Sequence, residues 1–112
     1  FEGDVEQFEV ASMAPTQVLP VVPGTAMAPA FGHIFSGGYA AGYYGYKWAE
    51  VLEADAFSLF KEKGIFNREV SGSFRENILS KGGTEHPMEL YVRFRGHKPE
   101  TRALIEKMGL GK

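Results

Sequence analysis

The stretch Phe31–Glu50 reads FGHIFSGGYAAGYYGYKWAE, and it is the most informative part of the chain. It holds one His, four Tyr, one Trp and five Gly. A solvent-facing helix would carry more charge, and an ordinary core would use Leu, Ile and Val. Tyr combines an apolar ring with a hydroxyl that needs a partner, and Gly lets another backbone come close. The composition therefore indicates a wall that touches a ligand backbone and donates hydrogen bonds to it.

The sequence on either side of this stretch predicts helices separated by glycines and prolines. Asp4 is a suitable N-cap for a first helix that ends at Met13. No segment shows the alternation of a strand followed by a hairpin turn. We therefore expect an all-α fold of four or five helices in a bundle or layer. After the first helix, the expected helices cover residues 39–63, 67–80, 84–96 and 99–109, with Asn67, Thr84 and Pro99 at their starts and Gly64, Gly82, Gly96 and Gly109 at their ends.

A long proline-rich connection is expected over residues 14–30, because four prolines in this range forbid a continuous helix. A connection of this length inside a compact unit is either functional or a simple surface linker. It contains Val18, Leu19, Val21 and Val22. We expect these apolar residues to lie on a core rather than in water.

Bulk properties exclude several classes of function. The chain has 112 residues, a net charge of −2 and no long run of one charge sign, which argues against a nucleic-acid partner. No apolar run reaches the roughly 20 residues that a membrane span needs, and no segment has the layout of a signal peptide. Without cysteine there is no disulfide framework and no thiolate chemistry. We expect a cytoplasmic protein, with the periplasm as the alternative.

Three tyrosines in the aromatic stretch fall on one face if that stretch is helical. Tyr39, Tyr43 and Tyr46 stand at positions i, i+4 and i+7. They could be core aromatics whose hydroxyls find buried partners. However, three phenols on one face need three hydroxyl partners, which a small core rarely supplies. The pattern leaves a functional surface and a core as the two interpretations.

The histidines do not form a metal site of their own. His33 precedes the Gly37–Gly38 pair, while His86 and His97 stand in polar contexts where solvated surface is expected. Zinc needs three or four ligands, and the chain has no His-Glu-x-x-His motif. We therefore expect no metal ligand within this chain.

The aromatic stretch is nevertheless similar to a known signature. It resembles the C-terminal region of the thimet-oligopeptidase family of zinc peptidases, most closely the bacterial peptidyl-dipeptidase (dipeptidyl carboxypeptidase) branch. The shared features are the His, the Gly-Gly-Tyr turn, the Tyr-Tyr-x-Tyr cluster and the Trp that follows. The resemblance continues through the segments Phe74–Gly83 (FRENILSKGG), Pro87–Leu90 (PMEL), Phe94–Gly96 (FRG) and Met108–Leu110 (MGL).

The resemblance implies a role for each of several residues. In such peptidases the equivalents of His33, Tyr39 and Tyr46 face the zinc across the cleft, where they bind the substrate backbone and the oxyanion. We therefore predict His33 and Tyr46 as catalytic residues. The predicted substrate contacts are His33, Gly37, Gly38, Tyr39 and Tyr46, whereas Tyr43 and Tyr44 are assigned to packing. The family's zinc motif lies upstream of this region, so the zinc would belong to the longer parent, and this chain alone would bind none and be inactive.

Three interpretations remain. The first is a single C-terminal helical subdomain, residues 1–112, of a longer peptidase that releases C-terminal dipeptides; the start at Phe1 rather than Met favours a piece of this kind. Its partners would be the peptide substrate and the rest of the parent. The second is a non-catalytic helical module that binds peptides or another subunit, and the third is a structural piece. A fragment would expose formerly buried apolar surface, so we also expect self-association through residues 14–30.

Overall fold

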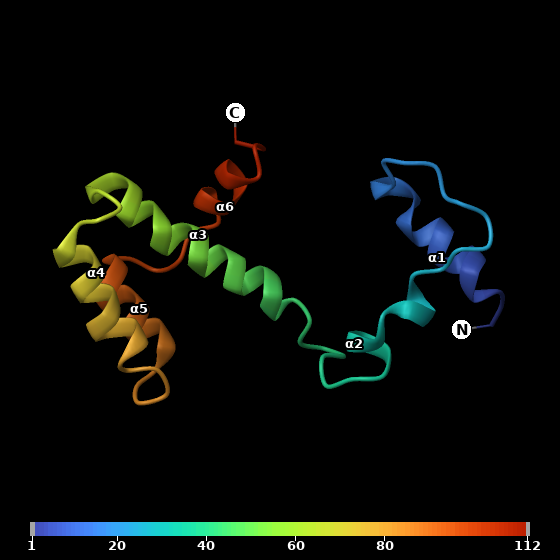
Figure 1. Ribbon diagram of the computed structural model, residues 1–112. Helices are drawn as coiled ribbons and strands as arrows, with labels where there is room; N and C mark the ends of the chain where they lie inside the picture. Colours follow the sequence, from blue (N-terminus) through green and yellow to red (C-terminus); the bar gives the residue numbers. More distant parts are fainter. Residues whose placement is uncertain (1, 112) are drawn as a thin grey trace. The chain divides into compact units, whose positions relative to one another are not determined.

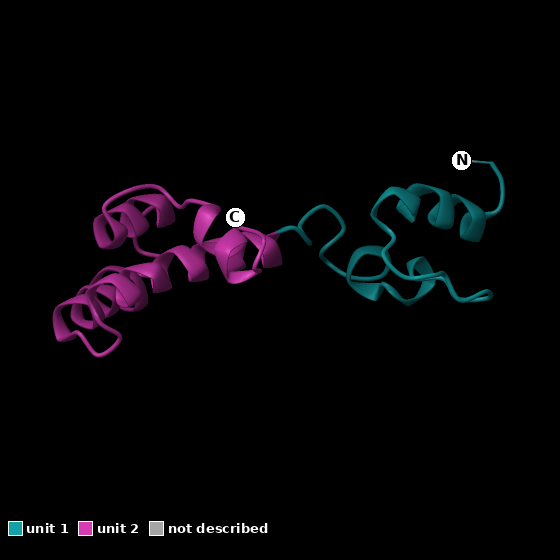
Figure 2. Cartoon of the chain, turned by 90° about the horizontal axis from the view of Figure 1, so that it is seen from above, with its two compact units in different colours: residues 1–44 teal, residues 45–112 magenta. Residues whose placement is uncertain are grey.

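The computed structural model describes residues 2–111, so Phe1 and Lys112 lie outside the described residues. The chain divides into two compact units, Phe1–Tyr44 and Gly45–Lys112, which Figure 2 colours separately. Within the described range all regular elements are helical (Figure 1), which confirms the all-α class. This range holds six α-helices rather than four or five, because residues 32–35 form an additional single turn.

Unit 1 contains one helix of useful length and three short turns. Helix α1 (Val5–Met13) begins as predicted, because the Oδ1 of Asp4 accepts a hydrogen bond from the N–H of Gln7 at 2.9 Å. Proline stands at the start of each of two 3₁₀ turns and prevents a longer helix. The short elements are η1 (Ala14–Thr16), η2 (Ala28–Ala30) and α2 (Gly32–Phe35).

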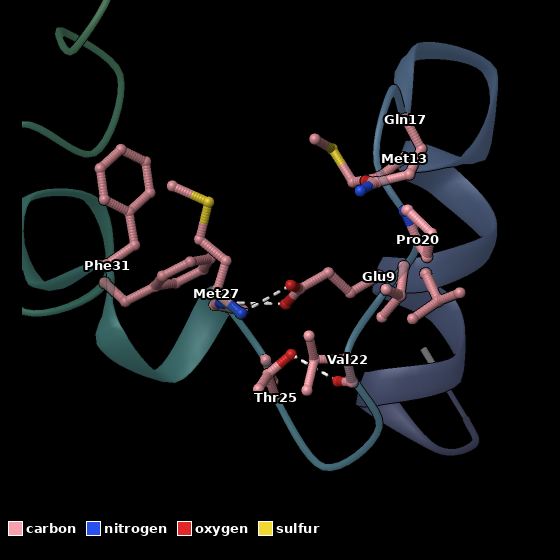
Figure 3. Close-up of a pocket in the computed structure, with 13 residues that line it drawn as sticks. Glu9, Met13, Gln17, Pro20, Val22, Thr25, Met27 and Phe31 are labelled. Carbon is pink, nitrogen blue, oxygen red and sulfur yellow. Dashed lines mark hydrogen bonds between the residues drawn. The ribbon is translucent and has the colours of Figure 1, made fainter.

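The proline-rich connection returns to α1 through a carboxylate clamp. Glu9 on α1 accepts hydrogen bonds from two backbone N–H groups, that of Met27 at 2.6 Å and that of Ala28 at 2.8 Å (Figure 3). Hydrogen bonds to a charged acceptor are the stronger kind. The clamp therefore fixes the end of the connection against the helix.

The expectation that the connection lies on a core is wrong within this unit. Val18 is 92% exposed and Leu19 is 72% exposed. The physical reason is that none of the described residues of unit 1 is buried, so the unit offers no core for them to cover.

Unit 2 is built around a helix of 19 residues, α3 (Gly45–Lys63), which contacts both α4 (Arg68–Phe74) and α6 (Arg102–Lys107). Helix α4 continues into a π-helical turn, η3 (Arg75–Leu79), which contacts α5 (Pro87–Arg95). Figure 1 shows α4 and α5 side by side next to α3. The main core cluster consists of Ala56, Val70, Tyr91 and Phe94, with Leu52, Leu59, Phe60, Phe74 and Ile78 packed against it. The other buried apolar residues of the described range are Val51, Ala54 and Leu90.

The predicted ends of these helices are right where a local cap signal sets them. Asn67 caps α4, because its Oδ1 accepts hydrogen bonds from the N–H groups of Glu69 at 2.9 Å and Val70 at 3.2 Å. Gly64 and Gly96 follow α3 and α5 with φ values of +103° and +87°, in the left-handed region that favours glycine.

Three predicted helix starts are wrong. Helix α3 begins at Gly45 rather than Tyr39, because residues 39–44 form turns in a segment whose glycines disfavour helix. Helix α5 is capped by His86 rather than Thr84: Pro87 takes the first helical position, and the Nδ1 of His86 accepts from the N–H of Met88 at 3.2 Å. Helix α6 begins at Arg102, after Thr101, rather than at Pro99.

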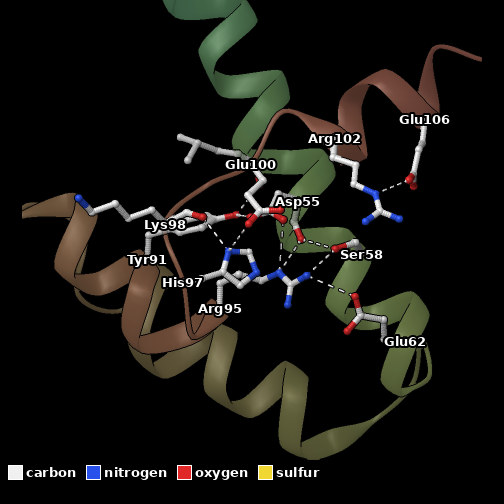
Figure 4. A network of polar contacts seen from close by, with 11 residues as sticks. Asp55, Ser58, Glu62, Tyr91, Arg95, His97, Lys98, Glu100, Arg102 and Glu106 are labelled. Carbon is white, nitrogen blue, oxygen red and sulfur yellow. Dashed lines mark hydrogen bonds and ion pairs between the residues drawn. The ribbon is translucent and has the colours of Figure 1, made fainter. Parts of the chain in front are cut away.

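A buried polar network joins α3 to α5 (Figure 4). Asp55 on α3 is only 3% exposed, and its Oδ2 accepts a hydrogen bond from the Tyr91 hydroxyl at 2.6 Å. Arg95 donates from Nε to the Asp55 backbone carbonyl at 3.1 Å and from Nη2 to the Ser58 hydroxyl at 2.9 Å. The Arg95 Nε also lies 3.5 Å from the Asp55 Oδ1. The buried carboxylate is therefore both hydrogen-bonded and charge-paired, as burial of a charge requires.

This network predicts a pH dependence of stability. Burial, together with the hydrogen bond to Asp55, raises the pKa of Tyr91 well above its ordinary value of 10.0. At pH values below the ordinary tyrosine pKa, the Tyr91 hydroxyl is protonated in both the folded and the unfolded chain. Above that pKa the unfolded chain loses the proton while the folded chain keeps it, so the free energy of unfolding falls as pH rises. We expect urea unfolding to show this loss, with a smaller slope for Tyr91→Phe. Equal slopes for the two proteins would contradict the assignment, since the other tyrosines are common to both.

Candidate functional site

The candidate site begins at the single helical turn α2, which carries His33. The N–H of Phe35 donates to the carbonyl of Phe31 at 3.1 Å, and the N–H of Ser36 donates to the carbonyl of Gly32 at 2.9 Å. The Ser36 hydroxyl donates to the same carbonyl at 3.1 Å. The turn is therefore closed on itself before the two glycines that follow.

A reverse turn then brings the chain back onto His33. The N–H of Tyr39 donates to the His33 carbonyl at 3.2 Å, and the N–H of Tyr43 donates to the Tyr39 carbonyl at 3.1 Å. As a result the His33 ring lies 5.7 Å from the Tyr39 ring and 5.8 Å from the Tyr43 ring, between centroids. Phe31 meets Tyr43 edge-on at 4.7 Å. We refer to Phe31, His33, Tyr39 and Tyr43 as the His33 cluster.

The His33 cluster presents polar groups at the surface. Tyr39 is 44% exposed and lies beside the exposed His33, whose ring is also in contact with the ring of Tyr43. Tyr43 itself is half-buried between its neighbours. A ligand can therefore reach an imidazole and a phenol side by side. The position of Tyr43 agrees with a packing role, whereas Tyr44 is 73% exposed and does not pack as expected.

Tyr46 lies in unit 2 and is therefore not part of the His33 cluster, which belongs to unit 1. It stands in the first turn of α3 and is 47% exposed. The expected single helical face of Tyr39, Tyr43 and Tyr46 is wrong, because residues 39–44 are turns rather than helix. What brings Tyr39 and Tyr43 together is their common contact with His33.

The two adjacent glycines differ in what the fold asks of them. A Cβ at Gly37 would lie 3.3 Å from the carbonyl oxygens of both Gly32 and His33, which is tighter than ordinary contact. A Cβ at Gly38 would have no atom within 4 Å, and neither residue has a positive φ. A side chain at Gly37 would therefore require the two carbonyls to shift by a few tenths of an ångström, whereas Gly38 faces open space where a ligand backbone could approach.

This difference predicts opposite outcomes for two alanine variants. Gly37→Ala should displace the turn and change the near-ultraviolet circular dichroism of the tyrosines, because two carbonyls must move. Gly38→Ala should leave that spectrum unchanged. If the spectrum of Gly38→Ala changed as much as that of Gly37→Ala, the close contact at Gly37 would not be what shapes the turn.

The described residues do not fit a metal ion. Within residues 2–111, no group of three or more His, Cys, Asp or Glu side chains is placed to hold one. A zinc site needs at least three protein ligands, and the described residues do not supply such a set. None of the helices in the described range combines the length and apolar character that crossing a membrane requires.

The site residue that was not predicted from the sequence is Phe31, which packs against the predicted ones. Phe31 packs against Tyr43 and lies 6.5 Å from the His33 ring. The sequence does show an aromatic residue two positions before the histidine. Its contact with Tyr43, however, arises only because the reverse turn brings Tyr43 back to it. The cluster carries phenol and imidazole groups, which are of the kind that can donate hydrogen bonds to a peptide backbone or a developing oxyanion.

The His33 cluster therefore places phenol and imidazole groups at the surface of unit 1. The chain belongs to peptidase family M3, whose sequence profile matches residues 4–110. The family that the sequence resemblance indicated is thereby confirmed.

Individual relatives include two kinds of bacterial enzyme. Oligopeptidase A of Escherichia coli is 63% identical over 81 residues, which are 72% of this chain and 12% of that protein. Dipeptidyl carboxypeptidase of E. coli is 42% identical over 108 residues, 96% of this chain and 16% of that protein. A probable cytosolic oligopeptidase A of Arabidopsis thaliana is 48% identical over 99 residues, 85% of this chain and 14% of that protein. The chain thus spans only a small share of the length of these relatives.

Proposed function

We propose that this chain is the C-terminal part of a zinc peptidase of family M3 and forms the substrate-facing wall of its cleft. We call the longer polypeptide the parent peptidase. The observation that carries the proposal is the His33 cluster, an exposed phenol and imidazole held together by a turn, in a chain that belongs to this family. The zinc ligands would come from the rest of the parent, since the described residues of this chain do not fit the ion.

Each predicted site residue has a physical task in this proposal. The hydroxyl of Tyr46 donates to the oxyanion of the tetrahedral intermediate, a contribution of about 3–4 kcal/mol for one donor. His33 and Tyr39 donate to carbonyls of the peptide backbone. Gly37 and Gly38, which are both exposed, offer backbone groups to an extended peptide. None of these tasks can be carried out without the parent, so we propose that the isolated chain is inactive.

Two forms of the activity differ in whether cleavage depends on the free C-terminus of the peptide. Release of C-terminal dipeptides is supported by the relative named dipeptidyl carboxypeptidase, whose match covers nearly the whole chain. Internal cleavage of short peptides is supported by the higher identity to oligopeptidase A over a shorter stretch. We propose dipeptide release as the first form and oligopeptide cleavage as the alternative. We place the parent in the cytoplasm, with the periplasm as the alternative.

The test is hydrolysis by the parent peptidase of one peptide with a free C-terminus and of the same peptide with an amidated C-terminus. We expect zinc-dependent release of a dipeptide from the free peptide only, and no hydrolysis by the isolated chain. Cleavage of both peptides at internal bonds would replace dipeptide release by the oligopeptidase form. Peptide binding without any cleavage would overturn the peptidase proposal in favour of a non-catalytic binding module.

A further inference from the structure

Unit 1 contains an apolar groove that the site described above does not use. Its volume is about 750 Å³, and it lies between one face of α1, the proline-rich connection and residues 31–35, which include α2 (Figure 3). The apolar side chains that shape it come from all three segments. They include Val10, Met13, Val21, Val22, Phe31 and Phe35.

The unit that holds this groove has no core of its own. None of its described residues is buried, and Val22 and Met27 at the groove are 64% and 62% exposed. A folded piece of this size without a core, disulfide or metal needs a partner to bury its apolar surface. The groove is the natural place for that partner, since the Glu9 clamp already holds its two sides together.

The partner's chemistry follows from the polar side chains that line the groove. There are three, and each makes a hydrogen bond within unit 1. Glu9 accepts from the backbone of Met27 and Ala28. The Gln17 side chain donates to the Leu19 carbonyl at 2.6 Å, and the Thr25 hydroxyl donates to the Val22 carbonyl at 2.7 Å. We infer an apolar occupant, because most of the lining is apolar and each of its three polar side chains already has a hydrogen-bond partner within unit 1.

We propose that an apolar segment from the remainder of the parent peptidase docks in this groove and holds unit 1 in place. The proposal rests on the function proposed above. Its support is the length of the relatives: the dipeptidyl carboxypeptidase that matches 96% of this chain uses only 16% of its own length to do so, and the rest is available to supply the segment. The docking would fix the His33 cluster, since Phe31 belongs both to the groove and to the cluster.

The test is reassembly from two chains. This chain is co-expressed with E. coli dipeptidyl carboxypeptidase shortened to end where its match to this chain begins. We expect a one-to-one complex in size-exclusion chromatography with light scattering. Val22→Asn should weaken the complex roughly tenfold or more, because it buries an unpaired amide. Val18→Asn is the matched control: it lies on the same connection, is 92% exposed and does not line the groove, so affinity should stay within about twofold.

A second measurement covers the case in which the shortened partner does not fold. The matching region of intact dipeptidyl carboxypeptidase is replaced by this chain, and peroxide oxidation of Met13 and Met27 is followed by mass spectrometry. In the isolated chain these residues are 49% and 62% exposed. We expect both to be protected in the chimera, with Val22→Asn reducing the protection and Val18→Asn leaving it unchanged.

The outcomes separate this inference from the proposed function. A complex that is sensitive to Val22→Asn but hydrolyses no peptide supports the groove and contradicts the function. A hydrolysing complex that Val22→Asn and Val18→Asn affect equally supports the function and overturns the groove. Overturning results also include unprotected methionines in the chimera, or a homodimer of this chain that Val22→Asn disrupts, because the occupant would then be a second copy.

Discussion

Replacement of Tyr46 by Phe in the parent peptidase should lower the turnover rate constant on the order of a hundredfold or more, while KM changes little. The variant removes one hydroxyl and leaves the ring in place. Tyr46 is 47% exposed in the first turn of α3, so its side chain is placed where a ligand can reach it. Steady-state kinetics and thermal unfolding on the same preparation measure the two effects separately.

Tyr44→Phe is the matched control for this experiment. Tyr44 stands two positions earlier, is 73% exposed and has no assigned contact with substrate, so turnover should be unchanged. If Tyr46 were instead a core residue with a buried partner, the pattern would reverse. The free energy of unfolding would drop by roughly 1 kcal/mol or more from the unpaired partner, and turnover per folded molecule would hold.

The largest expected loss of stability comes from Asp55→Ala in the network between α3 and α5. Asp55 is 3% exposed, and its removal leaves the Tyr91 hydroxyl and the largely buried Arg95 guanidinium without their carboxylate. Removing one partner of a buried ion pair costs roughly 3–5 kcal/mol. Since small domains are stable by only about 5–15 kcal/mol, urea unfolding should show unit 2 destabilised by a large fraction of its total.

An exposed pair on the same helix provides the control. Glu50 bonds Lys47 at 2.8 Å, with side chains 45% and 69% exposed, and surface pairs of this kind contribute little. Glu50→Ala should therefore leave the unfolding midpoint almost unchanged. The double variant Asp55→Ala/Tyr91→Phe should lose less unfolding free energy than the sum of the losses in the two single variants, because both substitutions remove the same hydrogen bond. Strict additivity would show that Asp55 and Tyr91 stabilise the fold independently rather than through their shared hydrogen bond. An Asp55→Ala effect as small as that of Glu50→Ala would show that the network does not stabilise the fold.

The parts of the fold that the sequence predicted correctly are those set by local signals. Asp4 and Asn67 cap their helices through their own side chains, and Gly64 and Gly96 end helices with positive φ. The predicted start of α3 was wrong because i, i+4 and i+7 spacing also fits a segment that folds as turns. The hydrogen bond from the Tyr39 N–H to the His33 carbonyl shows that this segment is a reverse turn rather than helix.

The tertiary contacts were beyond local reasoning. Tyr91 is 36 residues from Asp55 in sequence, and Arg95 is 40 residues from it. No spacing rule reaches that far, and nothing in the residue types marked this aspartate as buried. For the candidate site, the residue types and the family were predictable, whereas the contacts of Phe31 and Tyr43 with His33 required the structure.

Whether this chain faces the substrate is decided by a crystal structure of the parent peptidase with a phosphinate peptide bound. The tetrahedral phosphinate oxygens stand in for those of the intermediate. We expect the Tyr46 hydroxyl at hydrogen-bond distance, about 2.5–3.0 Å, from one of these oxygens, with His33 and Tyr39 against the peptide backbone. A bound peptide with all three side chains turned away from it, and their polar groups paired inside the protein, would show that this stretch is not the substrate-facing wall.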